Sequence, residues 1–223
     1  MRKTFLYTVL SGLSLLISCT TDNYDKGQGK YSLTQAELVD ITINSQQEAT
    51  SFVTDDGSRF TLTPPATASW ITTADTVYRA ILYFNQLSET AAEVVSMGAV
   101  PTLRAVNHWR LKEQAEDPLG MESAWMSKNG KYLNLGLLIK TGQADDNDGR
   151  QKIGLAQDTI RLNDDLTHTA VFRLLHDQSG VPEYYTSRNY VSILLPDTVQ
   201  LDTIRLTILT YEGKKERLFV IKR

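Results

Sequence analysis

One segment of the chain has the side chains of a calcium-binding loop. Four acidic or amide residues are followed there by a glycine, Asp145-Asp146-Asn147-Asp148-Gly149. The calcium loop of an EF-hand needs a glycine at its sixth position and a glutamate at its twelfth. Counted from Asp145, the glycine is fifth and Ala156 is twelfth. The spacing excludes an EF-hand, and we expect the segment to be the solvated tip of a hairpin.

The chain has three histidines, His108, His168 and His176. In one extended strand His168 and His176 would be more than about 20 Å apart, so we do not expect them to share a metal ion. The sequence contains no HExxH, GxSxG or Walker motif. We therefore assign no catalytic, cofactor-binding or metal-binding residue. A hydrolase with a Ser-His-Asp triad stays an alternative, because the members of a triad need not be close in sequence.

Aromatic side chains offer a third kind of chemistry. Trp70, Trp109 and Trp125, together with the pair Tyr184-Tyr185, could form a surface on which sugar rings stack. Aromatic residues of a β-sandwich are more often part of the core or cover a sheet edge, because they bury a large apolar area. Binding of a glycan is therefore an alternative, and it requires that the tryptophans be exposed.

The most specific motif lies near the N-terminus. Arg2 and Lys3 precede an uncharged, mostly apolar run over residues 5–17, and Leu16-Ile17-Ser18 leads directly into Cys19, the only cysteine. A run of thirteen residues suits a signal peptide and is too short for a bilayer span, which needs about 20 residues. The order Leu-Ile-Ser-Cys resembles a bacterial lipobox, in which a diacylglycerol is attached to the cysteine thiol before cleavage.

We therefore predict a signal peptide over residues 1–18, lipid attachment at Cys19 and a flexible polar tether over residues 19–31. The acyl chains would hold the protein on a membrane without a transmembrane helix. Thr20 is not the aspartate that retains many lipoproteins at the inner membrane, and the acidic residues at positions 22 and 25 resemble the start of surface-exported lipoproteins of Bacteroidetes. We expect the outer membrane, with the protein on the cell surface or the periplasmic face.

Composition limits the partners further. The net charge of the chain is −3, and it becomes −5 when the segment that carries Arg2 and Lys3 is removed. Lysine and arginine cluster only near the C-terminus, so we expect no nucleic-acid partner. After cleavage the chain is long enough for one large domain or two small ones.

Short apolar strands begin near Ala36. Asp55-Asp56-Gly57-Ser58 is a hairpin turn between two of them, since an Asp-Gly pair tolerates positive φ. Residues 77–84 (VYRAILYF) are apolar on both faces and predict a central strand, whereas residues 88–95 fit a helix or a strand. Residues 103–106 would complete a small barrel, which places the first domain at residues 32–107.

The second domain, residues 108–223, also reads as β. Asn129-Gly130 is a turn signal, and the strand that follows alternates, with Leu133, Leu135, Leu137 and Ile139 on one face. Further strands are expected at residues 153–156, 169–175, 190–195 and 204–211, before a last hairpin at Glu212-Gly213-Lys214. Regular short strands separated by turns predict an all-β chain that ends in a sandwich or barrel.

These residues together suggest a family. The hairpin VTDDGSRFTL, the segment DPLGMESAWMSKNGKYLNLGLLIK and the later FRLLHDQSGVPEYYTSRNYVSILLP resemble the NigD-like lipoproteins of Bacteroidetes. Ala74-Asp75 departs from the Gly-Asp pair expected before the central strand. The resemblance implies an OB-like barrel followed by an antiparallel β-sandwich, and favours a strand for residues 91–97. It implies no catalytic residue and no cofactor.

The function expected from these observations is binding without catalysis. The chain would be a cell-envelope lipoprotein that binds a protein or ligand, with a bacteriocin-associated role implied by the family resemblance alone. A glycan-binding accessory module is the first alternative, and a hydrolase with a dispersed triad is the second.

Overall fold

The computed structural model describes residues 33–143 and 149–221. The signal peptide, Cys19, the tether and Asp145–Asp148 of the acidic segment lie outside the described residues, so the expectations about them stay predictions. From Thr34 onward the chain forms one compact unit. Within the described part there is no α-helix, and so none that is long and apolar enough to cross a membrane.

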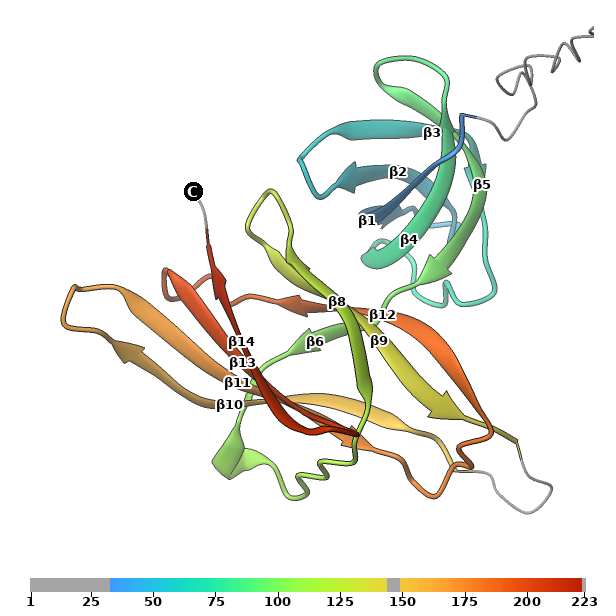
Figure 1. The fold of residues 1–223 in the computed structure, drawn as a ribbon. Coiled ribbons are helices and arrows are strands. Elements are labelled where there is room, and N and C mark those ends of the chain that lie inside the picture. The colour runs from blue at the N-terminus through green and yellow to red at the C-terminus, as the bar shows by residue number, and fades with distance from the viewer. Residues whose placement is uncertain (1–32, 144–148, 222–223) are drawn as a thin grey trace, which may run out of the picture. The chain divides into compact units, whose positions relative to one another are not determined.

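The first five strands close into a barrel. They are β1 (Gln35–Ile43), β2 (Ala49–Thr54), β3 (Arg59–Ala66), β4 (Val77–Gln86) and β5 (Ala91–Ala99), coloured blue to green in Figure 1. Their order around the barrel is β1-β2-β3-β5-β4, with β3 and β5 parallel and the other pairs antiparallel. This is the small closed barrel expected from the resemblance, and the segment left open between helix and strand is strand β5.

The barrel interior is filled by one face of each strand. Phe52, Phe60 and Phe84 pack together with ring centroids 4.9 to 5.8 Å apart. On β4 the inward residues Ala80, Leu82 and Phe84 are buried in this core. The residues that alternate with them, including Arg79, point out of the barrel. Strand β4 is therefore a central strand, as predicted, but its two faces have different surroundings.

The predicted hairpin turn joins β2 to β3. Gly57 has a φ of 93°, a conformation that costs a glycine little. Thr54 N donates to Ser58 O at 3.0 Å, and Asp56 Oδ1 accepts hydrogen bonds from Thr54 Oγ1 and Ser58 N at 2.5 and 3.1 Å. These hydrogen bonds lower the pKa of Asp56 to about 2. The turn holds Asp55 at the edge of the barrel.

Two further sheets form a sandwich. One has the order β14-β13-β11-β10-β7 and the other the order β6-β12-β9-β8. The strand bounds are β6 (Thr102–Arg104), β7 (Val106–Asn107), β8 (Gly120–Met126), β9 (Tyr132–Thr141), β10 (Lys152–Leu162), β11 (His168–Asp177), β12 (Tyr185–Leu194), β13 (Thr203–Thr210) and β14 (Gly213–Val220), and a 3₁₀ turn η1 (His108–Arg110) follows β7. Most pairs are antiparallel, whereas β6–β12, β7–β10 and β11–β13 are parallel.

The prediction that residues 103–106 complete the barrel is wrong. Strand β6 pairs with β12 and strand β7 pairs with β10, so both belong to the sandwich sheets. The physical reason is that pairing of β1 with β4 already closes the barrel, and a closed barrel has no free edge for another strand. The sheets change over between Ala99 and Thr102. The division into domains at residue 107 stays a proposal.

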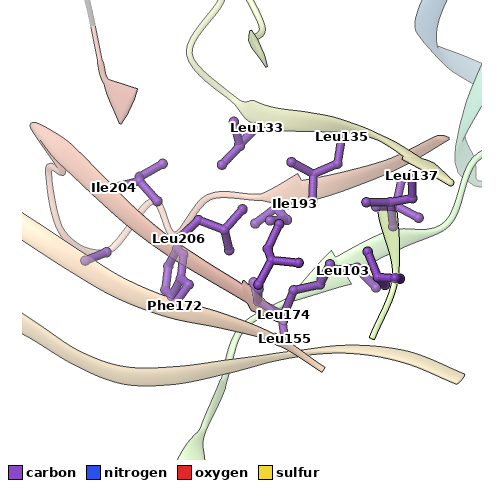
Figure 2. Close-up of a cluster of buried hydrophobic side chains, with 14 of the residues drawn as sticks. Leu103, Leu133, Leu135, Leu137, Leu155, Phe172, Leu174, Ile193, Ile204 and Leu206 are labelled. Atoms are coloured by element: carbon purple, nitrogen blue, oxygen red, sulfur yellow. The ribbon is translucent and has the colours of Figure 1, made fainter. Parts of the chain in front are cut away.

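The sandwich core lies between its two sheets. Figure 2 shows Leu133, Leu135 and Leu137 of β9 facing Phe172 of β11 and Leu206 of β13. The predicted alternation on β9 is confirmed, but the residues between the leucines are buried as well: Tyr132, Asn134 and Gly136. Something other than the core must cover that second face of β9.

Candidate functional site

The second face of β9 is covered by polar contacts with the barrel. Arg79 of β4, whose side chain is 1% exposed, reaches Asp55 Oδ1 and Oδ2 at 2.7 and 2.8 Å and Asp40 Oδ1 at 3.4 Å. Its guanidinium also donates to Asn134 Oδ1 of β9 and Ser192 Oγ of β12, both at 3.1 Å. Asn134 donates in turn to Asp55 at 2.8 Å.

A tyrosine and a lysine complete this set. The Tyr132 ring lies 4.1 Å from Arg79 Cζ, and its hydroxyl donates to Asp40 Oδ1 at 3.0 Å. Lys131 Nζ donates to Asp40 Oδ2 at 2.6 Å. Burial and then the Asp40 carboxylate raise the pKa of Tyr132. We call these seven residues the Arg79 network: Asp40, Asp55, Arg79, Lys131, Tyr132, Asn134 and Ser192.

The Arg79 network is balanced in charge. Two carboxylates, Asp40 and Asp55, face two cations, Arg79 and Lys131. Buried charges need such partners, since removal of one member leaves the other charge uncompensated. The charged groups of the Arg79 network thus neutralise one another. The role of the network is to join barrel strands to β9 and β12.

Beside the network lies a hollow of about 330 Å³. It adjoins a second space of about 230 Å³, with which it shares Glu37, Asp55 and Trp125. We call the two spaces together the junction hollow. The first is lined by Ala36, Glu37, Leu38, Asp55, Ile81, Tyr83, Trp125 and Tyr190, and the second adds Asp56, Met126, Ser127 and Lys128.

Aromatic rings form one wall of the junction hollow. Trp125 of β8 and Tyr190 of β12 lie on either side of β9 and meet edge to face, with centroids 6.2 Å apart. Between them, a Cβ at Gly136 would be 2.4 Å from Ser123 Oγ and 3.4 Å from the Tyr190 ring, so this position has no room for a side chain. Trp125 is 38% exposed, and Tyr83 of β4 is 41% exposed.

Carboxylates form the other wall. Asp55 is held by Arg79, and Asp56 lies 3.8 Å from the exposed Lys128. Among the described residues, the Glu37 carboxylate has no hydrogen-bond partner and no cation within 4 Å, while its backbone pairs with Leu82 of β4. Burial, and then the Asp56 carboxylate, raise the pKa of Glu37. The junction hollow therefore combines exposed rings with a carboxylate that the protein itself does not neutralise.

The tryptophans named from the sequence have three different surroundings. Trp70 packs against the barrel core and meets Tyr78 edge to face. Trp109, 66% exposed, lies in the 3₁₀ turn beside His108. Trp125 alone lines the junction hollow, and Tyr184-Tyr185 is exposed but lines neither space of it.

Sequence reasoning missed Tyr83, Tyr190 and Glu37. A signal for Tyr83 is present, because Arg79, Ile81 and Tyr83 alternate with the inward residues of β4. Tyr190 and Glu37 carry no comparable signal. Their role comes from strand pairing and from barrel contacts between residues far apart in the chain.

The face by which OB-fold barrels usually bind polymers is different. It is the outer surface of the second and third strands with the adjoining loops. In this chain the less buried residues of those strands include Val53, Arg59, Thr61 and Thr63 and no tryptophan or tyrosine. That face has no ring on which a base or sugar could stack, so the junction hollow is the better candidate site.

The histidines do not assemble a catalytic triad. His176 contacts Asp117 O at 3.2 Å and Gln151 Oε1 at 3.3 Å. His108 Nδ1 is 4.0 Å from Asp158 and has no hydrogen-bond partner. Over residues 33–143 and 149–221, no histidine side chain is hydrogen-bonded to both a hydroxyl group and a carboxylate. No group of three or more potential ligands that could hold a metal ion occurs in the same residues.

Solved structures from Bacteroidetes share this fold. A NigD-like immunity protein from Bacteroides caccae has a TM-score of 0.63 and 20% identity over 84% of this chain and 97% of its own. A protein named as a candidate toxin-related protein, from Parabacteroides distasonis, has a TM-score of 0.62 and 17% identity over 83% and 92%. A protein named as a candidate lipoprotein, from Bacteroides fragilis, has a TM-score of 0.57 and 10% identity over 85% and 98%.

These similarities confirm the fold that the sequence resemblance implied, a barrel followed by a sandwich. At this level of identity they concern the fold alone. No protein-family model matches the sequence, and no curated protein matches it either. None of the three structural neighbours is named as an enzyme.

Proposed function

We propose that this protein is a non-enzymatic cell-envelope lipoprotein that binds a protein or other ligand at the junction hollow. The observation that supports it most is the combination of partly exposed Trp125 and Tyr83 with the unneutralised Glu37 carboxylate in one concave site. Concave sites with apolar walls and a few polar groups are the usual form of binding sites.

Site-specific crosslinking in living cells tests the binding role. A benzophenone amino acid placed at Tyr83 in the hollow should give a discrete adduct that is absent when the same group replaces Trp109, an exposed residue outside the hollow. Adding the substitution Trp125→Ala to the chain that carries the benzophenone at position 83 should weaken the adduct. Equal adducts from both positions, or none from Tyr83, would contradict binding at the hollow.

The proposed location is the outer membrane, with Cys19 as the lipid-bearing residue. The sequence Leu16-Ile17-Ser18-Cys19 and a structural neighbour named as a candidate lipoprotein support it. Protease treatment of intact cells should remove a surface-facing protein from an immunoblot, whereas a periplasmic protein should be lost only after lysis. A wild-type chain that incorporates no labelled fatty acid, or a Cys19→Ala variant that still incorporates one, would contradict lipid attachment at Cys19.

A role near a bacteriocin is a finer part of the proposal. The sequence resemblance to NigD-like lipoproteins supports it, and so do structural neighbours named as an immunity protein and as a candidate toxin-related protein. Cells that lack this protein should be more sensitive to a bacteriocin than cells that carry it, and Trp125→Ala should fail to restore resistance. Unchanged sensitivity to a panel of bacteriocins from related strains would contradict this part.

Glycan binding is the second candidate, because two of the three tryptophans, Trp109 and Trp125, are exposed. It would place a sugar ring on Trp125. The polar groups of the junction hollow fit a neutral sugar less well than they fit a cation.

A further inference from the structure

We propose that the junction hollow receives a lysine or arginine side chain from a basic segment of a polypeptide partner. This inference rests on the proposed function, which names the hollow as the binding site, and it adds the chemical class of the ligand. It follows from three features of the hollow: its charge, its rings and the spaces beside it.

The charge of the junction hollow is negative. Of its three carboxylates, Asp55 is neutralised by Arg79, and Asp56 faces Lys128 at 3.8 Å. Lys128 is 79% exposed, so solvent weakens that ion pair. Glu37 has no cation of its own within ion-pair distance in the described part of the chain. A ligand that brings one positive charge would complete the set, and a ligand that brings a negative charge would be repelled.

The rings of the hollow favour the same charge. A cation over an aromatic face is attracted by the negative charge density of the ring. Among the described residues the protein places three of its own cations in such surroundings, one of them Lys131, which lies 5.0 Å from the Tyr132 ring centroid and 2.6 Å from Asp40. Arg79 lies over Tyr132 and faces carboxylates, and Lys140 Nζ lies 4.1 Å from the Tyr211 ring centroid and 2.9 Å from Glu183.

The polar atoms of the hollow suit a neutral sugar less well than they suit a cationic side chain. Hydroxyl groups of a sugar need both donors and acceptors, and ionised carboxylates can only accept. Ser127 Oγ already donates to Asn129 Oδ1 at 2.7 Å and accepts from Tyr132 N at 2.8 Å. The charged donor on the lining, Lys128, is 79% exposed and faces Asp56, so the Glu37 carboxylate and the rings favour a ligand that brings positive charge.

Two neighbouring spaces share lining residues with the junction hollow. One, of about 340 Å³, shares Glu37 and Asp56 with it and adds Glu89. The other, of about 380 Å³, shares Ile81 and Tyr190 with it and is otherwise largely apolar, with Arg188 at its side. A hollow with an acidic space and an apolar space beside it fits a segment that has basic residues next to an apolar one, better than it fits a single small cation.

Calorimetric titration of the full chain in a non-ionic detergent tests the inference. The probes are a tetra-arginine amide, a tetra-glutamate peptide and chitotetraose. We expect only the arginine peptide to bind. Glu37→Gln should weaken its binding about tenfold, the effect of losing one hydrogen-bonded charge, and Trp125→Leu should weaken it by a similar factor. The binding should also weaken in 0.5 M NaCl, since salt screens exposed charges.

Matched variants separate the site from the overall charge. Asp164→Asn removes one carboxylate from an exposed loop of the sandwich, and Trp109→Leu removes one exposed ring; neither should change the affinity. Thermal unfolding of each variant shows whether it is folded, and Glu37→Gln keeps the shape of the side chain.

The outcomes distinguish the inference from the function on which it rests. Binding of the arginine peptide that Glu37→Gln and Asp164→Asn weaken equally, or that Trp125→Leu leaves unchanged, overturns the inference. So does the absence of binding at millimolar peptide. If chitotetraose binds instead and Trp125→Leu abolishes that binding, the inference fails while the hollow remains the binding site. If Tyr83 also gives no specific adduct in cells, the proposed function fails as well.

Discussion

The Arg79 network and the junction hollow contain the same types of side chain and lie side by side. They differ in whether their charged groups have partners within the protein. Each combines carboxylates with aromatic rings, and Asp55 belongs to both. In the network every charge has a partner, and Arg79 is almost fully buried. In the hollow the Glu37 carboxylate has no cation within 4 Å among the described residues, and the rings of Trp125 and Tyr83 are partly open to solvent. Charged groups that all have partners stabilise the fold, whereas a charged group without a partner is available to bind a ligand.

Replacing Arg79 with methionine should have the largest effect on this comparison. It removes the cation that neutralises Asp55 and the more distant of the two cations that face Asp40, so we expect the free energy of unfolding to fall by about 3 kcal/mol or more. Urea denaturation measures it. Arg59→Met, which removes an exposed cation from β3, is the control and should change stability little. Equal effects of both changes would contradict the structural role of the network.

Replacing Gly136 with alanine should have the next largest effect. The added Cβ would lie 2.4 Å from Ser123 Oγ, so Ser123 must rotate and the Trp125–Tyr190 contact must adjust. Overpacking of this kind costs about 1–3 kcal/mol. In a Ser123→Ala background the same change should cost less, because the closest atom is gone. A double-mutant cycle from urea unfolding measures that coupling, and a cycle with no coupling would contradict the close approach.

The turn that carries Asp55 and Asp56 should give a smaller effect, visible only in acid. Hydrogen bonds from Thr54 and Ser58 hold the pKa of Asp56 at about 2 in the folded protein, below its ordinary value of 3.8. A carboxylate with a lowered pKa stabilises the folded state above its unfolded pKa, and this contribution disappears as the pH falls from about 4 to 2.

Asp56→Asn should therefore flatten the pH dependence of the unfolding midpoint between pH 4 and 2. Because Asp56 is exposed, the effect should be modest. Unfolding curves of the wild-type chain and the variant at several pH values measure the difference. An identical pH dependence in the two proteins would show that the turn hydrogen bonds do not favour the ionised form.

Glu37→Gln should change stability least, and in the opposite direction. Burial raises the pKa of Glu37, so the ionised group slightly disfavours folding at every pH above that raised value. The change to glutamine removes this penalty, and we expect the free energy of unfolding at pH 7 to stay within about 0.5 kcal/mol of wild type or to rise. A clear loss of stability would place Glu37 among the structural residues rather than at a binding site.

Strands and turns could be predicted from the sequence because their signals are local. Asp55-Asp56-Gly57-Ser58 and Asn129-Gly130 mark turns, and the leucines of β9 mark the face that fills the sandwich core. The alternation says nothing about the other face, where Asn134 is fully buried. That burial depends on Arg79, 55 positions away along the chain.

The candidate site could be predicted only in part. The sequence points to Trp125 because a tryptophan ring can stack on a ligand, but its partners come from separate strands that only the fold brings together. Residues 103–106 show the same limit. Their pattern indicates one strand, whereas the structure has two short strands there, β6 and β7, whose partners differ because the closed barrel has no free edge.

The path of the chain after the barrel bears on how such a protein can evolve. Strands β6 and β7 follow the barrel almost directly, and each supplies one edge of a different sandwich sheet. A gene fragment that begins after β7 would encode a sandwich with an uncovered edge on β12 and on β10, a form prone to pairing with other chains. We expect the sandwich to be inherited, exchanged and duplicated only together with β6 and β7.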